Sequence, residues 1–149
     1  FDRFGYAFIK PKGSPYPPIL DMNNLLGPLS VSGAGGTINI IPFYVKHGGI
    51  DALGFKINDF AYLPDVSEIP PESWKHLNNL DCWVVDALRY TPHPSHSHLS
   101  QTLEWIEKAN PKRAIITNMH IDLDYETVCM ETPNRVTAAY DGMTVRYEI

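Results

Sequence analysis

The sequence is short of cysteine, of positive charge and of long apolar runs. Only Cys82 and Cys129 occur, and Cys82 lies inside an apolar run, so we expect both thiols to be reduced in a cytoplasmic protein. Twelve Lys and Arg against seventeen Asp and Glu give a formal net charge of -5, which disfavours nonspecific nucleic-acid binding. No apolar stretch approaches the roughly 20 residues of a membrane helix, so we expect no membrane association.

The chain also lacks a methionine at its start, where Phe1-Asp2-Arg3-Phe4 stands, so we expect an amino-terminal portion that this sequence does not include. What is present suits a globular domain, since 44% of the 149 residues are hydrophobic. Prolines crowd the first part, among them Pro15, Pro17 and Pro18, and proline removes backbone donors. Residues 1–36 are therefore predicted to form an irregular Pro/Gly-rich arm, and residues 37–149 the folded domain.

Alternating runs of strand and helix character follow the arm. Strands are predicted at 37–46, 53–57, 60–63, 82–86 and 114–117, with Pro42 indicating an edge or a bulge and Asn58-Asp59 a hairpin turn. A short helix is predicted from Pro70-Pro71 and a longer one from a Ser97 cap to Asn110, and the tail is predicted to form a hairpin at Asp141-Gly142. This order predicts an α/β fold, a mixed sheet with helices on one face.

Histidines and an aspartate stand where these strands give way to loops, which is where ligands gather in layered α/β proteins. The four positions are His47, Asp65, His96 and His120. Imidazole and carboxylate suit Zn²⁺ or Mn²⁺, and a carboxylate can bridge two ions, which makes Asp65 the bridge candidate. Two such ions would activate water as hydroxide and hold the oxygens of a phosphoryl displacement.

Several segments in this order resemble the carboxy-terminal half of metallo-β-lactamase-fold hydrolases, and most of all the phosphoribosyl 1,2-cyclic phosphate phosphodiesterases. These segments are AYLPDVSEIP (61–70), DALR (86–89), HPSH (93–96), TNMHIDLDY (117–125) and AYDGM (139–143). The resemblance covers most of the chain from about His47 onward. It implies half of a four-layered αββα sandwich and a bacterial, metal-dependent phosphoric diester hydrolase.

The resemblance also implies roles for individual residues. His47 and Asp65 match metal ligands, and His96 matches an active-site histidine that binds the phosphate and can protonate the leaving oxygen. Many relatives have histidine where this sequence has Asn118, so His120 is predicted to complete the metal site through a local shift. The implied cofactors are two divalent ions, zinc or manganese, and the substrate is a small cyclic or nucleotide-like phosphate ester.

The family's His-x-His-x-Asp-His motif, which supplies most metal ligands, is absent from this sequence. We therefore expect the chain to be a fragment that alone binds metal weakly and is inactive. A half-chain leaves a sheet face and edge unshielded, so we also expect a homo-oligomer or strand exchange through the exposed sheet.

Simpler interpretations stay open for each of these residues. His47 can be a loop residue, and Asp65 can be a helix cap or turn former. Asp86 either orients an imidazole or caps the end of a strand, while His98 and Asn118 can support the site from behind the ligands. At the level of function, the alternatives are a nuclease of the tRNA 3′-processing type with the same fold, or a noncatalytic module that binds a nucleotide or a partner.

Overall fold

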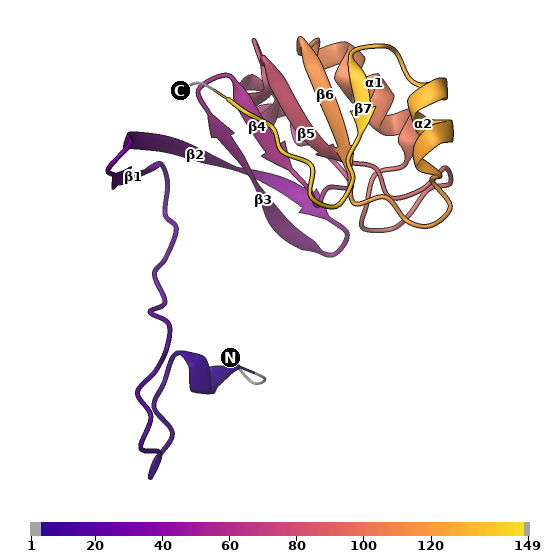
Figure 1. Cartoon of the computed structure of the whole chain (residues 1–149). Coiled ribbons are helices and arrows are strands. Elements are labelled where there is room, and N and C mark those ends of the chain that lie inside the picture. Colours follow the sequence, from indigo (N-terminus) through magenta and orange to yellow (C-terminus); the bar gives the residue numbers. More distant parts are fainter. Residues whose placement is uncertain (1–3, 148–149) are drawn as a thin grey trace.

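The computed structural model describes residues 4–147, and a mixed seven-stranded sheet in the order β1-β2-β3-β4-β5-β6-β7 forms its body (Figure 1). The strands are β1 (Leu29–Gly33), β2 (Gly36–His47), β3 (Ile50–Ile57), β4 (Phe60–Leu63), β5 (Cys82–Asp86), β6 (Arg113–Thr117) and β7 (Val136–Ala138). The helices are α1 (Leu99–Ala109), α2 (Tyr125–Glu131) and the 3-10 turns η1 (Gly5–Ala7) and η2 (Pro71–Leu77). Within residues 4–147 no helix is long and apolar enough to cross a bilayer.

Strands β1 to β4 form the antiparallel part of the sheet. The predicted hairpin around Asn58-Asp59 is confirmed, and Asn58 has the positive φ of 51° that such a tight turn uses. Pro42 pairs with Phe55 on one side, whereas the pairing of β2 with β1 ends at Ile40. Pro42 thus stands where β2 has become an edge, which confirms its predicted place and explains how the strand tolerates a missing donor.

Strands β4 to β7 are parallel, and helices cover one face of them. Their apolar runs place Trp83, Val85 and Ile116 in the core with no exposed surface, as expected for strands covered on both faces. Helix α1 lies behind the sheet in Figure 1 and contributes Leu99 and Ile106 to this core. The predicted α/β class and mixed sheet are confirmed.

Three predicted details are wrong. Ser97 does not cap the helix; α1 begins at Leu99, and the buried Ser97 hydroxyl donates to the main-chain oxygen of Asp86 at 2.7 Å. The tail contains the Asp141-Gly142 turn but no second strand through residue 147, because β7 pairs with β6 in parallel instead. Strand β1 lies inside the predicted arm, since the turn after Gly33 pairs it with the first half of β2.

The face of the sheet opposite α1 is only partly covered. The segment after β7 crosses it, and the rings of Phe60 and Tyr147 lie 5.6 Å apart (Figure 1). Beside this segment is a hollow of about 410 Å³ with an apolar lining: Leu25, Leu29, Ile40, Phe55, Ile57, Phe60 and Tyr62. An open apolar hollow of this kind indicates a surface that packs against something else.

Candidate metal centre

The topology brings the carboxyl ends of four strands to one edge of the sheet. Strands β4, β5 and β6 are parallel, and β2 points the same way because two antiparallel pairings separate it from β4. His47 is the last residue of β2, Asp65 follows β4, Asp86 ends β5 and Asn118 follows β6. Residues up to 71 positions apart in sequence, from 47 to 118, therefore share one edge.

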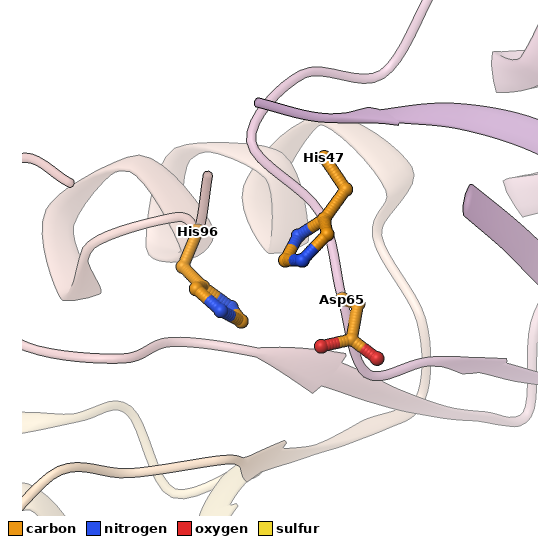
Figure 2. Close-up of side chains that lie close together, drawn as sticks. All are labelled: His47, Asp65 and His96. Carbon is orange, nitrogen blue, oxygen red and sulfur yellow. The ribbon is translucent and has the colours of Figure 1, made fainter. Parts of the chain in front are cut away.

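Two of these side chains, His47 and Asp65, lie together with His96 from the loop before α1. One ligand atom from each can be chosen so that all three atoms lie within 4.8 Å of one another. Figure 2 shows the two imidazole rings and the carboxylate turned toward a common space. The rings of His47 and His96 meet edge to face with centroids 4.6 Å apart. All three residues are half-buried.

Gly48 allows the loops that carry the two histidines to approach each other. Its φ is +63°, and a Cβ added there would lie 2.9 Å from Cβ of Ser95. Its amide also donates to Oγ of Ser67 at 3.0 Å, and that hydroxyl donates to the carbonyl of Lys46 at 3.1 Å. The residue after His47 is thus tied both to the loop of Asp65 and to the loop of His96.

His96 is oriented from behind by Asp86. Nδ1 of His96 lies 2.8 Å from Oδ2 of Asp86, and the same oxygen accepts the amide of Val66 at 3.2 Å. The Asp86 side chain has no exposed surface, and burial raises the pKa of its carboxyl, while the hydrogen bond with His96 opposes that rise. When Asp86 is ionised its carboxylate only accepts, so Nδ1 of His96 then carries the proton and Nε2 is left for a ligand or substrate. Of the two roles open to Asp86, orienting an imidazole is the one this hydrogen bond supports.

The donor set fits a divalent metal ion. The His47 imidazole and the Asp65 carboxylate are ligand types of zinc and related ions, and His96, with the buried Asp86 carboxylate behind it, lies beside them. Nδ1 of His47 is buried and has no hydrogen-bond partner among residues 4–147. A buried polar atom without a partner is costly, and an ion bound through this nitrogen would remove that cost.

The other predicted site residues lie outside this group. His120 is exposed, with its Nδ1 3.4 Å from Oδ2 of Asp122, and its role as a ligand stays a prediction. Nδ2 of Asn118 donates to the carbonyl of Pro64 at 3.1 Å and so supports the loop that carries Asp65. His98 stands before α1, where its Nδ1 contacts the Ser100 hydroxyl at 2.9 Å.

The structure adds two features to those taken from the sequence. His96 belongs to the same cluster as His47 and Asp65, and the packing of Gly48 on Ser95 sets the spacing of the two rings. No local sequence signal marks the first feature, because it depends on a contact between segments far apart in the chain. No helix begins at Asp65, so its reading as a helix cap is wrong.

Residues 2–121 match the β-lactamase superfamily domain, and the chain belongs to this family. A crystal structure of a diphosphatase from the PhnP family is similar, with 31% identity and a TM-score of 0.80 over 87% of this chain and 50% of that one. A curated octanoyltransferase from Porphyromonas gingivalis is 29% identical over 95% of this chain. This chain spans about half the length of that diphosphatase and 29% of the octanoyltransferase.

Two further solved structures share the fold at low identity. Human tRNase Z, short form, has a TM-score of 0.58 and 18% identity, over 75% of this chain and 44% of that one. Zinc-bound PqqB from Methylobacterium extorquens has a TM-score of 0.60 and 14% identity, over 86% of this chain and 55% of that one. The predicted metallo-β-lactamase fold is confirmed, and the fold implies binding of a divalent metal ion.

Proposed function

We propose that this chain is the carboxy-terminal half of a metal-dependent phosphoric diester hydrolase that acts on a small cyclic or nucleotide-like phosphate ester. The observation that carries the proposal is the convergence of His47, Asp65 and His96 at one sheet edge. The similarity to a diphosphatase of the PhnP family, at 31% identity, supports phosphate chemistry in particular.

His47 and Asp65 would hold metal, with His120 as a further proposed ligand and the remaining ligands supplied by the other half of the fold. One or two zinc or manganese ions bound there would polarise the phosphoryl group and lower the pKa of an attacking water. Hydrolysis forms a bond from that water oxygen to phosphorus and breaks the bond from phosphorus to the leaving alcohol oxygen. The leaving oxygen then needs a proton.

His96 is placed to supply that proton. Asp86 fixes its ring through Nδ1, so Nε2 is the atom that meets the phosphate or the leaving oxygen. The main-chain oxygen of Asp86 is itself held by the hydroxyls of Ser97 and Thr102, each at 2.7 Å. This second layer of hydrogen bonds keeps the carboxylate behind His96 in place.

The test uses the product of the whole gene with Mn²⁺ or Zn²⁺ and bis-p-nitrophenyl phosphate as substrate. We expect chelator-sensitive release of p-nitrophenol, loss of bound metal in His47→Ala and Asp65→Asn, and a kcat lowered roughly 100-fold or more in His96→Ala with metal retained. The control is His76→Ala, whose ring stacks on Phe43 away from the cluster. If no phosphate ester is turned over with any divalent metal, the proposal is wrong.

A nuclease is one alternative function, because human tRNase Z has the same fold. The net charge of -5 argues against it, since it disfavours binding of a nucleic acid. A noncatalytic binding module is the other alternative, and elemental analysis separates it, because such a module would carry no stoichiometric metal. The octanoyl transfer in the name of the curated relative does not extend to this chain, which matches only 29% of that protein.

A further inference from the structure

A third histidine, His93, lies beside the candidate metal centre without belonging to its group of possible ligands. The centroid of its ring is 5.3 Å from that of His96, and the two ring planes are tilted by 48°. His96 in turn meets His47 with centroids 4.6 Å apart, so the three imidazoles contact one another in series. The position of His93 next to the centre therefore calls for a role other than holding metal.

The loop around His93 determines which of its ring nitrogens carries the hydrogen. The main-chain amide of Ser95 donates to Nδ1 of His93 at 3.3 Å, and the Ser95 hydroxyl lies 3.3 Å from the same nitrogen. Because an amide can only donate, Nδ1 of His93 is the acceptor, and in the neutral ring the hydrogen is on Nε2. Within residues 4–147 no hydrogen bond is made by Nε2 of His93, so this N–H is available to a ligand.

His96 has the opposite arrangement. Its Nδ1 lies 2.8 Å from Oδ2 of Asp86, and when that carboxylate is ionised the hydrogen of the neutral ring is on Nδ1, which leaves Nε2 as an acceptor. The neutral rings of His93 and His96 therefore offer one hydrogen-bond donor and one acceptor side by side. The difference comes from their partners, a main-chain amide for His93 and a buried carboxylate for His96.

The loop that carries this donor is held on both sides. Before it, Arg89 donates through Nε to the carbonyl of Thr91 at 3.1 Å and through Nη2 to that of Pro92 at 2.6 Å. After it, Ser95 packs so closely on Gly48 that a Cβ added to the glycine would lie 2.9 Å from Cβ of the serine. A donor that is already fixed in place loses little conformational entropy when a ligand binds to it.

We propose that the Nε2–H group of His93 donates to a non-bridging oxygen of the substrate's phosphoryl group, while His96 protonates the leaving oxygen. The inference rests on the proposed function and adds to it a second residue that contacts the phosphate. A hydrogen bond to a charged oxygen contributes roughly tenfold or more in affinity. That oxygen is negatively charged both in the bound ester and during the displacement, so the bond should lower KM and leave kcat unchanged.

Kinetics of the whole gene product with Mn²⁺ and bis-p-nitrophenyl phosphate test the assignment. In His93→Ala we expect KM, and the inhibition constant of inorganic phosphate, each to rise roughly tenfold, with kcat and metal content unchanged. His93→Gln carries an amide N–H in place of the ring N–H and should restore both constants to within roughly threefold of wild type. The control is His76→Ala, whose ring stacks on Phe43 away from the cluster and which should match wild type.

Three kinetic outcomes would overturn the inference. Unchanged KM and inhibition constant in His93→Ala, with bis-p-nitrophenyl phosphate still hydrolysed, would remove the contact and leave the proposed function standing. A loss of kcat or of bound metal at unchanged KM would assign His93 to the structure of the centre. A rise in KM that His93→Gln does not reverse would assign the effect to the loop rather than to the donor.

Nitrogen NMR of the imidazole rings tests the same assignment without turnover. In the zinc-loaded protein, at a pH at which the rings are neutral, His93 should be the Nε2–H tautomer, and inorganic phosphate should shift its Nε2 resonance. The Nδ1–H tautomer in His93, or a phosphate-induced shift of the His96 ring alone, would contradict the inference only. A shift of neither ring would contradict the inference together with the proposed function.

Discussion

Nδ1 of His96 lies 2.8 Å from Oδ2 of Asp86, which has no exposed surface. The pair links the end of β5 to the loop before α1, so a core strand positions a residue of the candidate site. Asp86 accepts two further hydrogen bonds. The amide of Val66 donates to its Oδ2, and the hydroxyl of Thr102 donates to its main-chain oxygen. The orientation of His96 is therefore built into the fold.

Replacing Asp86 by asparagine should separate orientation from charge. The amide oxygen of Asp86→Asn can still accept the proton on Nδ1, but it no longer stabilises a protonated His96 ring. We expect kcat to fall roughly 10- to 100-fold with bound metal unchanged, as is usual for residues that support a ligand or catalytic group. Asp86→Ala, which loses orientation as well, should be worse. Wild-type kcat in Asp86→Asn would contradict the role given to the carboxylate.

The same substitution should change the pH dependence of stability. Burial raises the folded-state pKa of Asp86 above its usual value of 3.8, so folding favours the neutral carboxyl more than the unfolded chain does. The stability that this carboxyl contributes is greatest below pH 3.8 and is lost as pH rises through the higher folded-state pKa. In urea titrations of metal-free protein at a series of pH values rising from 3.8, Asp86→Asn should lack this loss.

Substitutions at Gly48 and Gly49 test whether the close approach of the His47 loop to the His96 loop is needed for the site. An alanine at 48 would take a φ of +63° and place its Cβ 2.9 Å from Cβ of Ser95, whereas a Cβ at 49 has no neighbour within 4 Å. Gly48→Ala should destabilise the protein by roughly 1–3 kcal/mol and lower kcat, because the loop of His96 must move. Gly49→Ala should behave as wild type in denaturant titrations and assays. Equal effects of the two substitutions would show that the close packing on Ser95 does not matter.

Much of the architecture followed from local pattern, while the grouping of side chains at the site did not. The apolar run at 82–86 and the turn at Asn58-Asp59 predicted β5 and the β3–β4 hairpin, because burial on both faces and turn chemistry leave clear local signals. Ser97 was predicted as a helix cap because its hydroxyl precedes a helix. In the structure that hydroxyl donates instead to the main-chain oxygen of Asp86. The inclusion of His96 with His47 depends on a contact between Gly48 and Ser95, 47 positions apart, which no local pattern encodes.

His120 offers a test of where the site ends. Its ring is exposed, its Nδ1 lies 3.4 Å from Oδ2 of Asp122, and it is not part of the group formed by His47, Asp65 and His96. If it is a ligand, His120→Ala should lower metal content as His47→Ala does; if the described group is the whole contribution of this chain, metal content should stay at the wild-type level. Elemental analysis of both variants after dialysis, with His76→Ala as the control, distinguishes the two outcomes.

The open face of the sheet leads to a prediction about the 149-residue chain on its own. The hollow lined by Leu25, Phe55, Ile57 and Tyr62, among others, exposes apolar surface, and the chain spans about half of the diphosphatase, tRNase Z and PqqB structures. We expect a second copy of this chain to cover the hollow in the isolated polypeptide, because burying such surface gains roughly 25 cal/mol per Å².

Sedimentation of the isolated chain should therefore show a concentration-dependent dimer or larger species. Tyr62→Lys, which places a charge at the rim of the hollow, should shift that equilibrium toward monomer by roughly tenfold or more, since a lysine there must lose its hydration on association. Met130→Lys, at an exposed position on α2 outside the hollow, adds the same charge and should leave the equilibrium unchanged. A stable monomer at high concentration would contradict self-association. Equal effects of the two lysines would instead assign it to net charge.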